Sequence, residues 1–152
     1  FALFKSTSAN RTKNVAFVKS LGADEVIDYT QTDFTKTDAN YDIIYDTIGR
    51  STFKKSKRAL VKGGAYLSPV LSIPLLFQMI RTAIIGQKKA KFAATGMLSD
   101  DILRQMMINV VKVIQLGKLR LVIDRRYALE DVVKAHQYVD SGRKLGNIVL
   151  IP

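Results

Sequence analysis

The 152-residue sequence contains no cysteine and a single histidine, His136. Without thiols the chain can form no disulfide, no thiolate nucleophile and no cysteine-ligated zinc site, and one histidine cannot build a histidine-based metal cage. We therefore expect no zinc ion. The absence of disulfides is consistent with a reducing compartment, so a cytoplasmic location is expected.

A long uninterrupted apolar run is also missing. The most apolar window, residues 65–86, is interrupted by Pro69, Pro74, Gln78 and Arg81, and it falls short of the roughly 20 apolar residues that a membrane-spanning helix needs. We expect a strand, a turn and a buried amphipathic helix there, and no membrane span. The residues that follow Phe1 show no basic region, apolar stretch and small-residue cleavage site, so no secretory signal is predicted.

Acidic residues are absent between Gly49 and Asp100, and the net charge is +11. The cations of this stretch are Arg50, Lys54, Lys55, Lys57, Arg58, Lys62, Arg81, Lys88, Lys89 and Lys91. Such a surface could hold nucleic acid or anionic lipid. No helix-turn-helix signature, zinc knuckle or aromatic RNA-binding motif accompanies it, so nucleic acid is not the expected partner. We interpret it as a solvated face or one that meets an acidic domain. The alternative is a non-enzymatic basic module for nucleic acid or an acidic partner.

Short apolar runs alternate with amphipathic segments along the whole chain. The expected strands are Phe1–Lys5, Glu25–Tyr29, Tyr41–Asp46, Ala65–Val70, Lys89–Ala94, Leu121–Ile123 and Gly146–Pro152, and the expected helices cover residues 14–21, 51–61 (capped by Ser51), 73–85, 101–116 and 129–141. This alternation predicts the α/β class, with a doubly wound parallel sheet and helices on both faces. His136 falls on an apolar helical stripe and is predicted to be a packed core histidine.

The run Tyr41–Asp46 is almost entirely apolar between its acids, as is typical of a strand covered on both faces. It ends in Thr47, Ile48 and Gly49, a turn that leads into a helical pattern. Open α/β sheets bind ligands at the carboxyl ends of their strands, and glycine permits close backbone approach. These three residues are therefore candidate cofactor contacts, whereas Asp46 is expected to be hydrogen-bonded locally.

Hydroxyl and cationic side chains fill the segment after the first expected strand, a predicted polar loop without an acid. Its candidate cofactor contacts are Ser6, Thr7, Ser8, Asn10, Arg11 and Lys13. Dinucleotide folds for NAD usually place an acid after this strand, and those for NADP use arginine and hydroxyls for the 2′-phosphate. Because charge-assisted donors suit a phosphate, we predict a preference for NADP(H) over NAD(H).

Several stretches together resemble the cofactor domain of the medium-chain dehydrogenase/reductase superfamily, in its zinc-independent, quinone-oxidoreductase-like branch. They are FVKSLGADEVIDY (Phe17–Tyr29), YDIIYDTIG (Tyr41–Gly49), KRALVKGGAYL (Lys57–Leu67), VIDRRYALEDVVKAHQYV (Val122–Val139) and GNIVLIP (Gly146–Pro152). The resemblance begins near the second strand of that domain, because no G-x-G-x-x-G turn is present. It implies a truncated Rossmann-type domain over residues 1–118 and a β-α-β segment over residues 119–152 that rejoins the catalytic domain in the family.

The resemblance implies an intact enzyme that transfers hydride from NADP(H) to a quinone or an α,β-unsaturated carbonyl, with an N-terminal catalytic domain as the missing partner. The isolated chain is expected to be inactive, and a purely structural fragment stays open as an alternative. By resemblance, Tyr29 and Asn147 lie near the cofactor, and the strand at Lys89–Ala94 pairs across a homodimer. Ser68 is a further candidate cofactor contact, because it lies near the carboxyl end of the strand expected at Ala65–Val70. No catalytic residue is assigned, because hydride transfer is the cofactor's own chemistry.

Overall fold

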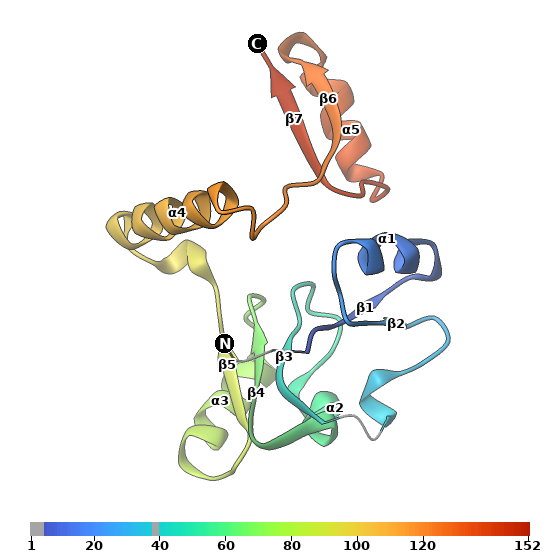
Figure 1. Cartoon of the computed structure of the whole chain (residues 1–152). Helices are drawn as coiled ribbons and strands as arrows, with labels where there is room; N and C mark the ends of the chain where they lie inside the picture. The colour runs from blue at the N-terminus through green and yellow to red at the C-terminus, as the bar shows by residue number, and fades with distance from the viewer. Residues whose placement is uncertain (1–4, 38–39) are drawn as a thin grey trace. The chain divides into compact units, whose positions relative to one another are not determined.

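The computed structural model describes residues 5–37 and 40–152 (Figure 1). It divides into two compact units, Phe1–Leu103 and Arg104–Pro152. The strand expected at Phe1–Lys5 lies, apart from Lys5, outside the described residues. Within these residues, no helix is both long and apolar enough to cross a membrane.

The first unit contains two parallel sheets (Figure 1). Its strands and helices are β1 (Thr7–Asn10), α1 (Val15–Ser20), β2 (Glu25–Asp28), β3 (Tyr41–Tyr45), α2 (Phe53–Ser56), β4 (Leu60–Ser68), α3 (Ile73–Ile84) and β5 (Lys89–Phe92). β1 pairs with β2, and β3, β4 and β5 form a three-stranded sheet in that order. Every one of these pairs is parallel, which confirms the α/β class and the parallel strand arrangement.

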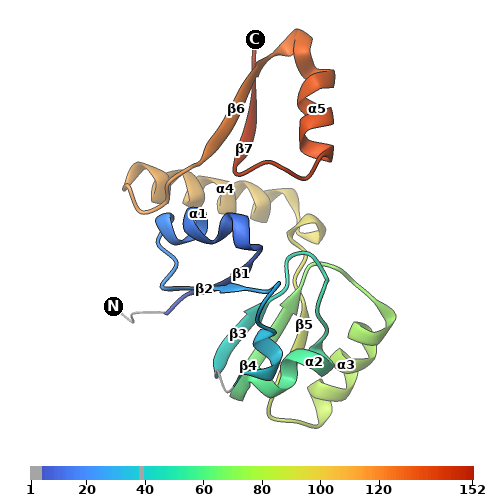
Figure 2. The ribbon, with the colours of Figure 1, turned by 90° about the vertical axis from the view of Figure 1, so that its right-hand side faces the viewer.

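The core of this unit lies on the face of the β3–β4–β5 sheet that α2 and α3 cover (Figure 2). Phe53 of α2 meets Tyr66 of β4 edge to face, with ring centroids 6.3 Å apart. Leu60, Leu75 and Ala90 complete the buried cluster. Residues alternate between the two faces of a strand, so Ile43 and Tyr45 flank the inward Ile44 and remain exposed.

The region between β3 and β4 differs from the sequence prediction. A helix was expected over residues 51–61, but α2 ends at Ser56, a 3-10 turn covers Lys57–Ala59, and β4 begins at Leu60. Lys62, Gly63 and Gly64 therefore lie inside a strand. A Cβ at Gly64 would lie 3.0 Å from the backbone oxygen of Asp42, so this glycine permits the close approach of β3.

The first turn of α2 is capped by Thr52, so the predicted cap at Ser51 is wrong. The Thr52 hydroxyl accepts a hydrogen bond from the Lys55 N–H at 3.3 Å. The Ser51 N–H instead donates to Asp46 at 2.7 Å. The cap has moved because Asp46 already holds the Ser51 backbone.

The most apolar window contains the predicted strand, turn and helix, but the helix is less buried than expected. α3 forms over nearly the expected residues, with Pro74 in its first turn and Ser72 as its cap. It buries Leu75 and Thr82, whereas Phe77 and Ile80 are exposed. The Thr82 hydroxyl accepts a hydrogen bond from the Ala90 N–H at 3.1 Å, which fixes the polar side of α3 against β5.

The second unit is a parallel β-α-β arrangement preceded by most of α4. Its elements are α4 (Asp100–Gln115, which begins in the first unit), β6 (Ile123–Ala128), α5 (Val132–Asp140) and β7 (Asn147–Ile151). The Asp124 carboxylate accepts hydrogen bonds from the Tyr138 hydroxyl at 3.0 Å and the Leu145 N–H at 2.8 Å. It therefore ties α5 and the loop before β7 to β6.

Two predictions for the second unit are wrong. The strand expected at Leu121–Ile123 lies at Ile123–Ala128, so Tyr127 is inside the strand and not in the connection after it. His136, predicted to pack in the core, is exposed, and its neighbour Ala135 is the buried position of α5. Successive residues of a helix are about 100° apart around its axis, so an error of one position is enough to place an exposed residue on the predicted buried face.

Gly146 provides a test of how closely β6 and β7 approach. A Cβ at this position would lie 2.6 Å from the backbone oxygen of Val122, so the backbone itself would have to move. We expect Gly146→Ala to lower the free energy of unfolding of this unit by about 2 kcal/mol, measured by amide exchange along β7. Gly96→Ala is the matched control, because no atom lies within 4 Å of its Cβ and its φ is not positive. Equal exchange rates in the two variants would contradict this packing.

Candidate cofactor-binding site

The carboxyl ends of β1 and β2 bring polar side chains together from two distant parts of the sequence. The parallel register places Asn10 beside Asp28, so Arg11 and Tyr29 both follow directly. The Arg11 Nε donates a hydrogen bond to the Tyr29 hydroxyl at 2.8 Å, and both side chains are exposed. Two predicted cofactor contacts are therefore adjacent at the edge where open α/β sheets bind ligands.

Asp28, the last residue of β2, holds the residues next to the Arg11–Tyr29 pair in place. Its carboxylate accepts hydrogen bonds from the Thr30 hydroxyl at 2.6 Å and the Thr30 N–H at 2.9 Å. The Thr12 hydroxyl, followed by that of Thr30, lowers the pKa of Asp28 below its usual value. The Thr12 and Thr30 hydroxyls lie 3.1 Å apart. This acid, together with Thr12 and Thr30, did not figure among the sequence candidates, although the parallel pairing of the two strands indicates them.

The segment predicted as one polar loop, residues 6–13, is partly a strand. Ser6 and Thr7 lie at the amino end of β1, where the Ser6 N–H and hydroxyl donate to Asp24 at 2.7 and 3.0 Å. Ser8 and Asn10 lie within β1, and the Asn10 Nδ2 donates to the Ser8 hydroxyl at 2.9 Å. The exposed Lys13 follows in a 3-10 turn, Thr12–Asn14. The structure thus brings Asn10 and Arg11 to the carboxyl edge and leaves Ser6 and Thr7 at the opposite end of the strand.

A second group forms where β3 ends. The Asp46 carboxylate accepts hydrogen bonds from the Gly49 N–H at 2.8 Å, the Ser51 N–H at 2.7 Å and the Tyr66 hydroxyl at 2.9 Å. The N–H groups of Ile48 and Arg50 point to the same carboxylate at 3.3 Å. The expectation that Asp46 is hydrogen-bonded locally is therefore confirmed, and this side chain determines the path of the turn. Tyr66 was not predicted as its partner.

Gly49 adopts a φ of +74°, a left-handed conformation that side chains other than glycine rarely take. A Cβ there would also lie 3.1 Å from the Val70 side chain. The turn from Thr47 to Gly49 can therefore lie close to the segment after β4 only because residue 49 is glycine.

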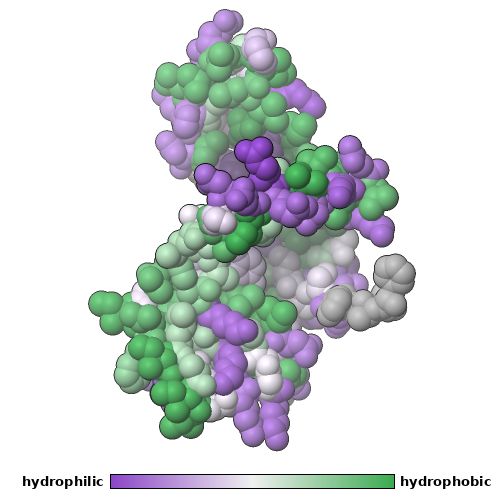
Figure 3. All heavy atoms as spheres, turned by 90° about the vertical axis from the view of Figure 1, so that its left-hand side faces the viewer, coloured by the Kyte–Doolittle hydropathy of each residue, from purple (hydrophilic) through white to green (hydrophobic). Residues whose placement is uncertain are grey.

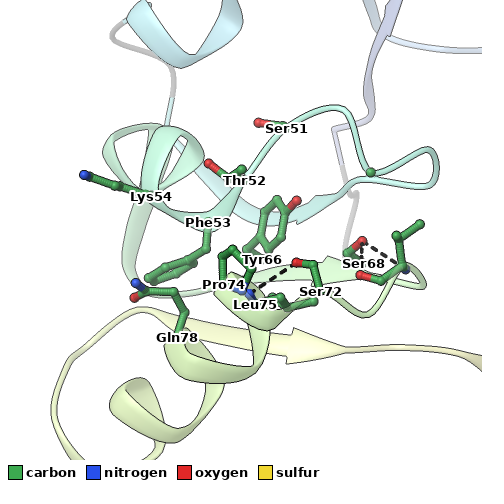
Figure 4. Close-up of a pocket in the computed structure, with 12 residues that line it drawn as sticks. Ser51, Thr52, Phe53, Lys54, Tyr66, Ser68, Ser72, Pro74, Leu75 and Gln78 are labelled. Atoms are coloured by element: carbon green, nitrogen blue, oxygen red, sulfur yellow. Dashed lines mark hydrogen bonds between the residues drawn. The ribbon is translucent and has the colours of Figure 1, made fainter.

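A pocket of about 270 Å³ lies beside this turn (Figure 4). Hydroxyl, amide, cationic and apolar groups line it: Gly49, Ser51, Thr52, Phe53, Lys54, Tyr66, Ser68, Val70, Ser72, Pro74, Leu75 and Gln78. Of the sequence candidates it brings together Gly49 and Ser68. The volume is slightly below that of a typical small-molecule site, so it would hold only part of a dinucleotide.

Asn147 lies in the second unit, at the start of β7. Its N–H and its Nδ2 both donate to the Val122 carbonyl, at 2.7 and 3.3 Å. Its side chain is thus engaged in joining β7 to the segment before β6. Among residues 5–37 and 40–152, no three His, Asp or Glu side chains gather where they could hold a metal ion.

The Asp46 carboxylate should make the stability of the first unit sensitive to acid. Burial raises its pKa, but hydrogen bonds from the Ser51 N–H and the Tyr66 hydroxyl outweigh burial and leave the pKa below 3.8. Burial of Tyr66 in the core, followed by its hydrogen bond to Asp46, raises the pKa of its hydroxyl. A carboxyl group whose pKa is lowered by folding stabilises the fold above its unfolded pKa and loses that contribution as the pH falls through the folded pKa.

We therefore expect the free energy of unfolding to fall as the pH is lowered below 3.8, and to fall less steeply in Asp46→Asn. Urea denaturation at a series of acidic pH values measures this. Asp24, Asp28 and Asp33 also have lowered pKa values, so part of the slope will remain in the variant. Identical slopes in both proteins would show that Asp46 is not one of the groups responsible.

Parallel strands whose carboxyl ends carry an arginine, hydroxyls and a glycine turn are typical of a Rossmann-like nucleotide-binding domain. A family profile described as zinc-binding dehydrogenase matches residues 21–150. The chain belongs to the zinc-binding dehydrogenase family.

Relatives agree with this assignment. The chain is 25% identical to the 2-methylene-furan-3-one reductase of Solanum lycopersicum, over 100% of the chain and 34% of that protein. It is 24% identical to the chloroplastic NADPH-dependent alkenal/one oxidoreductase of Arabidopsis thaliana, over 97% of the chain and 34% of that protein. The quinone oxidoreductase structure from Pseudomonas syringae pv. Tomato aligns with a TM-score of 0.73 and 25% identity, over 96% of the chain and 48% of that protein. The chain thus spans less than half the length of these relatives.

Proposed function

We propose that this chain is the partial cofactor domain of an NADP(H)-preferring oxidoreductase that reduces quinones or α,β-unsaturated carbonyls. In this proposal residues 1–118 belong to the nucleotide-binding domain and residues 119–152 to the segment that rejoins a catalytic domain. The intact enzyme works without zinc, in the cytoplasm, and pairs as a homodimer. Two of the relatives are themselves a 2-methylene-furan-3-one reductase and an NADPH-dependent alkenal/one oxidoreductase, and these activities support the reaction class.

The observation that carries the proposal is the Arg11–Tyr29 pair at the carboxyl ends of β1 and β2. The Tyr29 hydroxyl accepts one guanidinium N–H and thereby orients the remaining donors. Arg11 takes part in none of the ion pairs formed by the described residues, so its charge is available to an anion. A guanidinium with free donors suits a phosphate monoester, which is what distinguishes NADP(H) from NAD(H).

At the turn that follows β3, the hydrogen bonds of Asp46 indicate what each residue contributes. Asp46 holds the Gly49 and Ser51 backbone in place, and the pocket beside the turn offers Ser68 and Thr52 to a ribose or amide group. When bound, the nicotinamide supplies the hydride. The chain contributes binding and orientation. Because the glycine-rich turn that would hold the pyrophosphate is missing from this sequence, we expect weak binding and no turnover by the chain alone.

Calorimetric titration of the 152-residue chain with NADPH and with NADH tests the proposal. We expect NADPH to bind at least about tenfold more tightly, because the 2′-phosphate adds charge-assisted hydrogen bonds. Equal affinity for the two nucleotides would contradict the NADP(H) preference. Absence of binding by both would show that this chain carries no usable half-site.

A further inference from the structure

The outward face of α3 is the most apolar surface of any helix in the first unit. Leu75, Met79 and Thr82 point toward the sheet. The opposite side of the helix carries Ile73, Leu76, Phe77, Ile80 and Ile84, which are 85%, 46%, 64%, 59% and 79% exposed. We call these five residues the α3 stripe. They follow the i, i+3, i+4, i+7 spacing of one helix face, so they form a continuous ridge that faces away from the core.

The α3 stripe continues beyond both ends of the helix. Val70 and Leu71 before the helix and Ile85 after it are also exposed, at 46%, 54% and 74%. The 12 residues of α3 rise by about 1.5 Å each, so the helical part alone is about 18 Å long. Contiguous apolar surface of this extent usually marks an interaction site. Figure 3 shows hydrophobic side chains at the lower left of the view, over the first unit, with hydrophilic groups beside them.

Cations lie on α3 itself and near the carboxyl end of the helix. Arg81 lies on α3 at the edge of the stripe and is exposed. At the carboxyl end of the helix, the Lys88 ammonium donates to the Lys57 carbonyl at 2.9 Å, and the Gln87 carbonyl accepts the Gly63 N–H at 2.9 Å. These bonds bring Lys57 and the Lys62–Gly63 segment to the chain just after the carboxyl end of α3. No acid occurs from residue 50 to residue 99, and none of the ion pairs of the described residues involves these cations.

We propose that the α3 stripe and its flanking cations dock this protein on an anionic lipid bilayer. Apolar side chains would enter the boundary between headgroups and acyl chains, while Arg81, Lys57, Lys62 and Lys88 contact the anionic headgroups. α3 would lie in the plane of the surface and would not cross it. Both components of the surface are used in this arrangement.

A second copy of the chain and nucleic acid each suit only one of these two components. A second copy docked stripe to stripe would bring two basic rims against each other, which is unfavourable. Nucleic acid would contact the cations but would leave Phe77 and Ile80 in water. Charge complementarity together with the apolar ridge therefore favours an anionic bilayer.

Flotation with lipid vesicles tests the proposal, using the 152-residue chain. The vesicles are phosphatidylcholine alone or phosphatidylcholine with about 30% phosphatidylserine. We expect binding to the anionic vesicles, at least tenfold weaker binding to the neutral ones (about fivefold per cation engaged), and a further loss when salt is raised from about 0.1 M to about 0.5 M. Absence of binding to anionic vesicles would overturn the proposal.

Two pairs of matched variants separate the apolar and the charged contributions. Phe77→Ser with Ile80→Ser should weaken binding by at least about 100-fold, whereas Leu129→Ser with Val133→Ser, at exposed sites of the second unit, should leave it unchanged. Arg81→Gln with Lys88→Gln should weaken it by about 30-fold, and Arg104→Gln with Lys112→Gln, which changes the charge equally, should not. Equal losses within either pair would overturn the proposal. So would a dimer in sedimentation that the Phe77 and Ile80 substitutions dissociate, because the α3 stripe would then be a self-association surface.

Discussion

Replacing Asp46 with alanine is expected to lower the free energy of unfolding of the first unit by about 3 kcal/mol. The carboxylate accepts short hydrogen bonds from the Gly49 N–H, the Ser51 N–H and the Tyr66 hydroxyl. Removal of the carboxylate leaves these three donors without their acceptor. The cost is largest for the Tyr66 hydroxyl, because Tyr66 is buried. Hydrogen bonds to a charged acceptor are the strong ones, so their loss has a large effect. Urea denaturation with amide exchange of β3 and β4 measures it.

Three further variants identify the cause. Asp46→Asn keeps one acceptor oxygen and is expected to lose about half as much stability. Tyr66→Phe keeps the core ring and removes one donor, so about 1 kcal/mol is expected. Asp42→Ala, at an exposed acid within β3, the strand that Asp46 follows, should change stability by less than about 0.5 kcal/mol. If Asp46→Ala is no more destabilising than Asp42→Ala, the carboxylate does not organise the turn.

The elements that the sequence predicted well have strong local patterns. β2 and β3 consist of apolar runs followed by a turn, and both lie where they were expected. Gly22 follows α1 with a φ of +102°, as a helix-terminating glycine should. The regular alternation of these elements was enough to predict parallel pairing, because each pair of strands is connected through a helix or helical turn.

The elements that could not be predicted from the sequence depend on pairing with distant strands. β1 reads Thr-Ser-Ala-Asn and has little strand propensity, and it becomes a strand only by pairing with β2 in parallel register. β4 contains Gly63 and Gly64, which locally indicate a break, yet the approach of β3 requires them. For α3 the apolar period predicted the helix correctly. A period does not say which face is buried, and here Thr82 turns inward to bond Ala90.

The candidate site was predictable in its parts and not in its grouping. Arg11 and Tyr29 were both expected near a cofactor, one from its charge and one by family resemblance. They lie 18 positions apart, and only the register of β1 and β2 shows that they touch. The link between Asp46 and Tyr66 spans 20 positions and two strands. A sequence pattern with a period of two or of 3.6 contains no information about such a pair.

Arg11→Gln is expected to weaken NADPH binding by about 30-fold, because the guanidinium would contribute charge-assisted hydrogen bonds worth about 1.5–3 kcal/mol to the 2′-phosphate. NADH lacks this phosphate, so its affinity should change by less than about twofold. Glutamine retains a polar side chain of similar length and removes the charge. Calorimetric titration of the wild-type and variant chains with both nucleotides measures the ratio of affinities.

Two controls accompany this variant. Arg120→Gln removes the same charge from an exposed site in the second unit. It should leave both affinities unchanged, because Arg120 belongs to neither group of candidate cofactor contacts. Tyr29→Phe removes the oxygen that accepts the Arg11 Nε bond and keeps the ring. It should weaken NADPH binding by about fivefold, since Arg11 retains its charge but loses its orientation. An equal loss of NADPH and NADH affinity in Arg11→Gln would mean that Arg11 supports the fold of the site and does not discriminate between the two cofactors.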